Sequence, residues 1–203
     1  NLDPSITEHK ITKTFINSLL VSKTVNNVLL VCSDTYTKYI DKNDRTCKTI
    51  FSDSASSCII NNAKSNFKTK FTFFTDGSGF KNLIENDNKI TMNGSEVFFF
   101  TTSVVPKLFY QILKENNFKI TEVDHFIFHQ ASKLVLEKLI EDLNIPRNKF
   151  HTNYNKIGNT TSASIPIILE NLKKNKKIKK NDIVMMIGFG VGLSAAACII
   201  KWQ

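Results

Sequence analysis

Two short motifs in the last third of the chain carry side chains that can hold a reacting carbonyl group. His129 follows the apolar run His125–Phe128 and is itself followed by Gln-Ala-Ser. Asn159 lies in the run Gly-Asn-Thr-Thr-Ser-Ala-Ser, which begins at Gly158. N–H donors of this kind stabilise the negative charge that develops on a thioester oxygen during acyl transfer. The two motifs therefore predict acyl-transfer chemistry.

Either residue alone has an ordinary structural explanation. A histidine at the end of a strand is more often structural than catalytic, and an asparagine in a turn often caps a helix. As a pair they are complementary, because histidine donates at neutral pH through either tautomer and asparagine donates without titrating. The glycine-rich turn at 188–192 adds backbone N–H groups, although its sequence also suits a plain hairpin turn.

Covalent acyl transfer also needs a nucleophile, normally a cysteine thiolate activated at a helix N-terminus. The chain has four cysteines, at positions 32, 47, 58 and 198. Cys32, Cys58 and Cys198 lie in apolar, strand-like runs, where cysteine behaves as a small buried hydrophobe. The spacings fit neither a zinc site nor a disulfide framework, and reduced thiols indicate the cytoplasm. None of the four is placed to act as the nucleophile.

The first half of the chain is expected to contain one helix and three strands. Asp3-Pro4 is typical of a helix start, and this helix is expected to run to about Val21. Continuous apolar runs predict strands buried on both faces at Asn27–Ser33 and Ser56–Asn61. Alternation over Phe67–Phe73 predicts a half-exposed strand. The polar segments between them are expected to be loops, turns or connections, at 34–49, 76–79 and 84–93.

In the second half, strands are expected to alternate with helices. Apolar residues at helical spacing predict helices within 104–113, 135–143 and 165–172. Apolar runs predict strands at 123–128, 182–187 and 194–202, the last two joined in a hairpin through Gly190-Val191-Gly192. Such alternation indicates an α/β protein with a largely parallel sheet.

Composition favours a globular protein with acidic partners. The 203 residues are 41% hydrophobic and 22% charged, which suits a domain with a sizeable core. The formal net charge of +9 favours acidic partners, although the densest basic run, Lys173–Lys180, is also typical of a solvated helix end. We find no nucleic-acid motif with stacking aromatics, no signal peptide and no apolar stretch long enough to span a membrane. We expect a cytoplasmic protein that binds no nucleic acid.

Seven motifs, by their order and spacing, resemble one enzyme family. They are LLVCSDTYTKYIDKNDR from Leu29, IFSDSASSCII from Ile50, DGSG from Asp76, MNGSEVF from Met92, HQAS from His129, GNTTSASIP from Gly158 and GFGVGL from Gly188. From about Ile11 to Trp202 the chain resembles the later part of a β-ketoacyl-acyl carrier protein synthase III, a condensing enzyme of the thiolase superfamily. The resemblance implies a thiolase-like layered α/β fold, with the end of the first half over residues 1–88 and the complete second half over residues 89–203.

The resemblance also implies a mechanism. In the family, a cysteine takes an acyl group from a coenzyme A thioester. A histidine and an asparagine then help to decarboxylate a malonyl unit on acyl carrier protein, and the carbanion attacks the acyl-cysteine. These two roles fall to His129 and Asn159, and that of the oxyanion donor to the backbone N–H of Val191. No metal or bound redox cofactor is implied. The remaining substrate-contacting positions would be Phe189 at the mouth of the acyl pocket, Gly190, Gly192 and Ser132.

The chain departs from the family pattern at the nucleophile. Counting back from Asp34 without gaps places the family's cysteine near Ile6, yet no cysteine occurs before Cys32. The closest hydroxyls belong to Ser5 and Thr7. Three explanations stay open: a fragment of a longer enzyme, a truncated and inactive relative, or a site formed with another chain. The first two are favoured.

Three smaller departures affect the loops. Ser132 stands where the family has an asparagine, and its shorter side chain is expected to loosen the histidine loop. The segment Phe-Ser-Asp-Ser-Ala at 51–55 has serines where the family has glycines, which implies strain if those positions need positive φ. Leu134 stands where some members carry an arginine that docks acyl carrier protein. Three cations near it could still meet an acidic carrier protein or simply be exposed helix charges: Lys133, Lys138 and Arg147.

The resemblance favours a condensing acyltransferase of fatty-acid synthesis that forms a 3-oxoacyl product. The family pairs through an edge strand that the Ser56–Asn61 strand matches, so we expect a homodimer. One alternative is acyl transfer to an amine or hydroxyl without decarboxylation. The other is a non-catalytic subunit that binds acyl groups, which the missing cysteine supports and the retained His129 and Asn159 oppose. A basic nucleic-acid binder, revealed by salt-sensitive DNA binding, is a distant further possibility.

Overall fold

The structure is a computed structural model that describes residues 20, 22–61 and 67–203. The helix expected from Asp3 to Val21 therefore falls almost wholly outside the described residues, as do Ser5, Ile6 and Thr7. In the described part of the chain, no helix combines the length and the apolar character needed to span a membrane.

A five-stranded mixed sheet forms the centre of the molecule, in the order β3-β9-β8-β6-β7. Strand β6 is parallel to β7 and β8, whereas β9 is antiparallel to β8 and β3. The expectation of a largely parallel sheet is wrong, because the short β8–β9 connection forces an antiparallel pair. The strands are β3 (Phe71–Thr75), β6 (His125–Phe128), β7 (Phe150–His151), β8 (Ile183–Gly190) and β9 (Ser194–Lys201).

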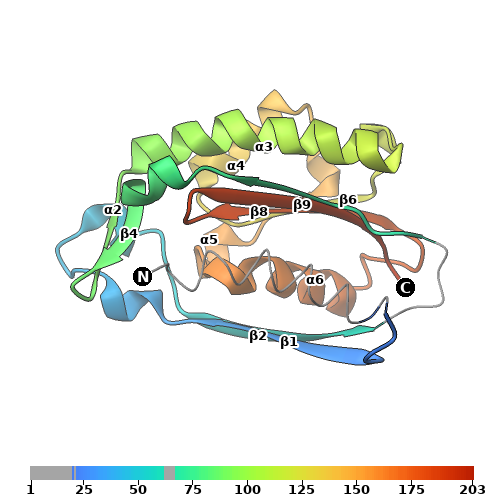
Figure 1. Cartoon of the computed structure of the whole chain (residues 1–203), viewed down its shortest axis with the longest axis horizontal. Helices are drawn as coiled ribbons and strands as arrows, with labels where there is room; N and C mark the ends of the chain where they lie inside the picture. The colour runs from blue at the N-terminus through green and yellow to red at the C-terminus, as the bar shows by residue number, and fades with distance from the viewer. Residues whose placement is uncertain (1–19, 21, 62–66) are drawn as a thin grey trace.

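Helices cover both faces of this sheet (Figure 1). Helices α3 (Gly94–Asn116) and α4 (Lys133–Asp142) lie on one face, and α6 (Ser164–Lys174) lies on the other. Side chains alternate along β6 accordingly: Phe126 and Phe128 pack in the main core with α3 and α4, while Ile127 packs beside α6. The predicted helices and strands of the second half are all confirmed. Their ends agree within a few residues, except that α3 begins at Gly94, ten residues before the apolar stripe that predicted it.

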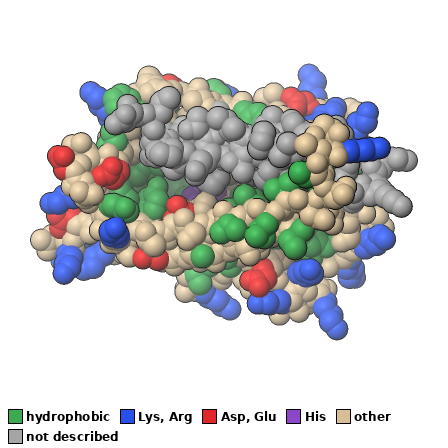
Figure 2. Space-filling view, turned by 60° about the horizontal axis from the view of Figure 1, so that its bottom comes forward, with side chains coloured by type: hydrophobic (Ala, Val, Ile, Leu, Met, Phe, Trp, Pro, Cys, Tyr) green, Lys and Arg blue, Asp and Glu red, His purple; other side chains and the backbone are tan. Residues whose placement is uncertain are grey.

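A two-stranded antiparallel sheet lies on the far side of α6 (Figure 1). It consists of β1 (Asn27–Asp34) and β2 (Ser54–Asn61). Both strands were expected to be buried on both faces, and this is wrong: burial alternates along each strand. Leu29, Val31 and Ile59 are 64%, 60% and 70% exposed on the face turned away from α6. Hydrophobic side chains gather on that side of the molecule (Figure 2).

The segment expected to be a polar connection at 84–93 is instead a hairpin of β4 (Leu83–Asn86) and β5 (Lys89–Met92). Its two-residue turn has positive φ at both Asp87 and Asn88, as a type I′ turn requires. Leu83 and Ile90 are buried in a small core with Cys47 and Phe51. The hairpin was missed because charged and polar residues outnumber these two apolar anchors.

Short helical elements complete the fold. The segment at 34–49, expected to be a loop, contains two of them, and Asp44 caps the second by accepting from Thr46 N–H. The turn expected at 76–79 is confirmed, with Asp76 capping a 3-10 helix. These elements are η1 (Tyr36–Tyr39), α2 (Arg45–Lys48), η2 (Gly77–Asn82), η3 (Ile120–Glu122), η4 (Arg147–Lys149), α5 (Tyr154–Ile157) and η5 (Thr161–Ala163).

Candidate active site

His129 directly follows β6 and is held by the sheet. Its backbone N–H donates to the carbonyl of Ile187 on β8 at 2.8 Å, which continues the strand ladder by one residue. Its ring lies edge-on to Phe189, with ring centroids 5.3 Å apart and planes at 87°. Nδ1 lies 2.9 Å from the Ser164 hydroxyl at the start of α6. The ring is therefore fixed from both the sheet and the central helix.

Gln130 secures the chain immediately after His129. Its side chain is fully buried, donates to the Phe128 carbonyl at 2.8 Å, and accepts from the Asn153 N–H at 2.8 Å. A buried amide with both ends satisfied fixes the backbone on either side of it. Sequence reasoning missed this role, because nothing in the Gln-Ala-Ser motif reveals which distant backbone group the amide meets.

Asn159 is positioned by a segment far from it in sequence. Its backbone N–H donates to the Ile50 carbonyl and its own carbonyl accepts from Ser52 N–H, both at 2.9 Å. Its side-chain Oδ1 accepts from Thr161 N–H at 2.9 Å. Because the amide oxygen is engaged in this way, the Nδ2 donors lie on the opposite edge of the amide group. Asn159 itself is buried.

Gly158 makes this placement possible. It has φ +67°, a conformation that side chains disfavour, and a Cβ at this position would lie 2.9 Å from the Ile50 carbonyl oxygen. Only glycine allows the strand segment at 50–52 to approach so closely. Nearby, Thr161 has φ +47°, which is rare for a β-branched residue. Strained backbone of this kind concentrates at functional sites.

The loop after Asn159 is tied to the two-stranded sheet. Ser162 donates to the Asp34 carboxylate through both its backbone N–H, at 3.1 Å, and its hydroxyl. The neighbouring serines at 52 and 54 are not among the residues with positive φ, so the conditional expectation of strain there does not apply. Instead, the Ser52 hydroxyl donates to the Ile157 carbonyl. This contact adds a further link between the 51–55 segment and the Asn159 loop.

The β8–β9 turn brings the third predicted element to the same place. Gly192 has φ +137°, and a Cβ there would lie 2.5 Å from the Ser194 hydroxyl oxygen, so this position also needs glycine. One cleft of about 1650 Å³ between the two sheets is lined by His129 and Asn159, by Phe189 and Gly190 at the end of β8, and by Val191 in the turn. Among the described residues, the sequence-predicted catalytic side chains are thus brought together. Their chemical roles stay predictions.

Ser132 lies at the edge of this cleft with a clear structural task. It is the N-cap of α4, and its hydroxyl accepts from Val135 N–H at 3.3 Å.

The three cations proposed for carrier docking lie on α4 or just after it. Lys138 pairs with Asp142 at 2.6 Å, and Arg147 pairs with Glu137 at 2.6 Å. The hydrogen bond and the charge of Asp142 raise the pKa of Lys138.

The four cysteines are not joined in disulfide bonds. Cys32, Cys58 and Cys198 line the cleft from β1, β2 and β9, whereas Cys47 is buried in α2. Cys198 is buried as expected, but Cys32 and Cys58 are only half-buried. Burial raises the pKa of the Cys47 and Cys58 thiols, which disfavours the nucleophilic thiolate.

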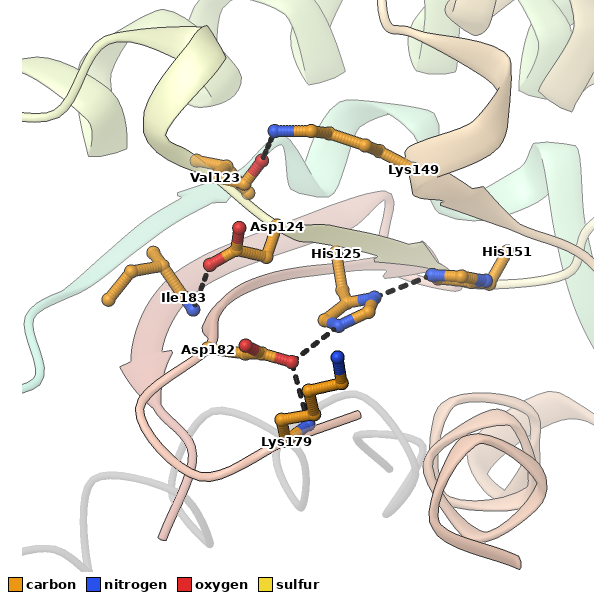
Figure 3. Close-up of polar contacts among 8 residues, drawn as sticks. All are labelled: Val123, Asp124, His125, Lys149, His151, Lys179, Asp182 and Ile183. Atoms are coloured by element: carbon orange, nitrogen blue, oxygen red, sulfur yellow. Dashed lines mark hydrogen bonds and ion pairs between the residues drawn. The ribbon is translucent and has the colours of Figure 1, made fainter. Parts of the chain in front are cut away.

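A second polar cluster lies at the other end of β6 (Figure 3). His125 Nε2 is 3.0 Å from Asp182 Oδ2, and its Nδ1 is 2.8 Å from Nε2 of His151. Asp182 also accepts from Lys179 N–H at 2.6 Å. Burial, together with the charges of His125 and Lys177, lowers the pKa of His151 to about 4. Burial acts to raise the pKa of Asp182, but the hydrogen bonds from Lys179 and His125 outweigh it and lower that pKa.

The layered arrangement of sheets and helices defines a thiolase-like fold. A crystal structure of a 3-oxoacyl-(acyl-carrier-protein) synthase III superposes with a TM-score of 0.90 at 28% identity, covering 94% of this chain and 64% of that one. The enzyme of the same name from Aquifex aeolicus gives a TM-score of 0.88 at 29% identity, covering 94% and 62%.

Sequence comparisons agree. Residues 13–77 match the family described as 3-oxoacyl-[acyl-carrier-protein] synthase III, and residues 113–202 match its C-terminal domain. Beta-ketoacyl-[acyl-carrier-protein] synthase III of Porphyra umbilicalis is 36% identical over 88% of this chain and 60% of its own length, and that of Staphylococcus aureus strain Newman is 34% identical over 87% and 58%. The chain belongs to the 3-oxoacyl-acyl carrier protein synthase III family. It spans about 60% of the length of these curated relatives.

Proposed function

We propose that this chain forms part of a condensing acyltransferase of fatty-acid synthesis. The reaction joins an acyl primer from coenzyme A to a malonyl unit on acyl carrier protein, with loss of carbon dioxide, and yields a 3-oxoacyl product. The names of the curated relatives support this class of reaction. The observation that carries the proposal is the convergence of His129, Asn159 and the β8–β9 turn on one cleft.

In this proposal, the His129–Asn159 pair stabilises the enolate. When the carbon–carbon bond to the malonyl carboxylate breaks, its electron pair moves onto the thioester and places negative charge on the carbonyl oxygen. The proposed donors are Nε2 of His129, whose ring meets Ser164 through Nδ1, and Nδ2 of Asn159, whose Oδ1 accepts from Thr161 N–H. Fixed donors at a developing oxyanion lower the barrier because they need no reorganisation during the reaction.

The remaining roles follow from position. The backbone N–H of Val191 would hold the oxygen of the tetrahedral intermediate, and Phe189 would border the acyl group. The primer would be carried by a thiolate that none of the four cysteines provides. Lys133, Lys138 and Arg147 would contact the acidic carrier protein from the α4 side. We place the protein in the cytoplasm, as a dimer paired through the edge of β2, with no resident metal or redox cofactor.

The experiment is decarboxylation of malonyl-acyl carrier protein labelled in its free carboxylate. This half-reaction needs the enolate stabilisers and not the nucleophile, so the chain itself can be tested. We expect labelled carbon dioxide to be released, and the rate to fall at least about 100-fold in His129→Ala and in Asn159→Ala. Asn171→Ala, which alters an exposed residue on α6, is the matched control. Equal rates in all four proteins would contradict the proposal.

A second candidate is a non-catalytic subunit that binds acyl groups, and the apolar side chains that line the cleft, among them Leu30, Phe98 and Ile165, favour it. It predicts saturable binding of acyl-coenzyme A with neither carbon dioxide release nor transfer. Acyl transfer to an amine or hydroxyl would instead consume acyl-coenzyme A without releasing carbon dioxide. Measuring both products in one reaction therefore separates the three possibilities.

A further inference from the structure

Ser164 makes two hydrogen bonds next to the proposed catalytic histidine. Its hydroxyl oxygen lies 2.9 Å from Nδ1 of His129 and 2.9 Å from the backbone carbonyl oxygen of Thr161. The residue is 1% exposed. No feature of the sequence predicted that Ser164 touches His129.

The number of available protons decides the direction of both bonds. A serine hydroxyl has one proton, and a carbonyl oxygen can only accept. If the proton pointed at His129, two oxygen atoms would face each other at 2.9 Å with no proton between them. The satisfied arrangement is therefore the one in which Ser164 donates to Thr161 and accepts from an Nδ1–H group of His129.

We propose that Ser164 is a positioning residue that keeps the proton of neutral His129 on Nδ1. Nε2 of the neutral ring then carries a lone pair and acts as a proton acceptor. It becomes a hydrogen-bond donor only when the ring gains a second proton. The strained φ of +47° at Thr161, whose carbonyl anchors the hydroxyl, fits a loop shaped for this contact.

The inference deepens the proposed function and rests on it for its consequences. During primer loading, Nε2 would take the proton of the nucleophilic thiol, which none of the four cysteines provides, as the bond from its sulfur to the acyl carbon forms. It would return this proton to the sulfur of the departing coenzyme A. Before decarboxylation, the neutral ring would take a second proton from solvent at Nε2. The resulting imidazolium would donate a hydrogen bond from Nε2 to the enolate oxygen and keep that proton, while a further solvent proton would end on carbon.

Other groups that titrate or carry charge also line the cleft and belong to any account of its pH behaviour. They come from every element around it, and the described ones are Asp34 and Cys32 on β1, Tyr36 on η1, Cys58 on β2, Lys68 before β3, Glu170 and Lys173 on α6, and Cys198 and Lys201 on β9. Because these groups titrate as well, an activity profile alone would not isolate His129. The test is therefore a direct measurement on the ring nitrogens.

The experiment is nitrogen-15 NMR of the imidazole rings at a pH about two units above the ordinary histidine pKa of about 6.5. The chain has four histidines, and the His129→Gln spectrum identifies the resonances of His129 by their loss. We expect a protonated Nδ1 and an unprotonated Nε2. In Ser164→Ala, the population should move toward the Nε2–H form, whereas Ser162→Ala, whose hydroxyl contacts Asp34, should leave it unchanged.

An Nε2–H tautomer in the unmodified protein would overturn the proposal without any variant, as would an unchanged tautomer in folded Ser164→Ala. The measurement needs no substrate. It can therefore fail while malonyl decarboxylation succeeds, or succeed while decarboxylation fails, so the two proposals are separable.

Discussion

At the scale of single residues, the candidate site depends on backbone positions as much as on the two side chains that would do chemistry. Asn159 has its place because Gly158 lets the chain pass within reach of the Ile50 carbonyl. His129 has its orientation because Ser164 and Phe189 contact its ring. The residue types at 129 and 159 could be read from sequence as donors, but these supporting contacts are set by the fold.

Replacing Gly158 by alanine tests the backbone argument. The new Cβ would meet the Ile50 carbonyl at 2.9 Å in a conformation with positive φ. We expect the free energy of unfolding to fall by about 1–3 kcal/mol, and malonyl decarboxylation to fall because Asn159 shifts. Urea unfolding measures the first effect. Gly94→Ala is the control, since a Cβ there meets nothing within 4 Å; equal stability of the two variants would refute the argument.

At the scale of elements, α3, α4, α6, β6, β8 and β9 were predictable because each has a strong apolar period or run. The β4–β5 hairpin was not, because two buried residues, Leu83 and Ile90, anchor otherwise polar strands. The existence of β1 and β2 was predictable, but not their half-exposed state, because burial depends on which layers cover a strand. The contact between His125 and His151 links two strands that are neighbours only in the folded sheet.

The cluster at the start of β6 predicts how stability depends on pH. The pKa of His151 is about 4 in the folded chain, against 6.5 for an ordinary histidine. Between these two pKa values, the unfolded chain binds more protons than the folded chain. The free energy of unfolding therefore increases as the pH rises through this range and decreases as the pH falls. His151 is partly exposed, so we expect an effect of only about 1–2 kcal/mol after screening by solvent.

Unfolding of the chain and of His151→Gln should be measured in urea from pH 4 to 7. The glutamine keeps a side-chain N–H donor but cannot titrate in this range. We expect a shallower pH dependence in the variant. Identical slopes would show that His151 does not carry this dependence, and a constant loss of stability at every pH would then reflect packing alone. The lowered pKa of Asp182 affects stability only at lower pH, below the ordinary aspartate value of 3.8.

At the scale of the whole molecule, the two-stranded β1–β2 sheet is an outer layer of the fold in the described part of the chain. Leu29 and Ile59 face each other across β1 and β2 on the exposed side. Contiguous exposed apolar side chains beside an open strand edge favour association. The solved relatives are longer chains, of which this one covers 64% in the first comparison.

Association can be tested by sedimentation equilibrium. We expect a mass of twice 23.1 kDa at micromolar concentration. Ile59→Lys, which places a charge beside the β2 edge, should shift the equilibrium toward the monomer, whereas Lys180→Ala on the exposed loop before β8 should not. A monomer under all conditions would exclude pairing through β2 in this chain.

The most direct test of the central claim is a double-mutant cycle on malonyl decarboxylation with His129→Ala, Asn159→Ala and the double variant. If the two side chains hold one enolate oxygen, they act as a unit, and the double variant should lose little more activity than the worse single variant. Losses that multiply would mean that the residues act independently. No loss from either change would mean that the cleft between the two sheets is not the decarboxylation site.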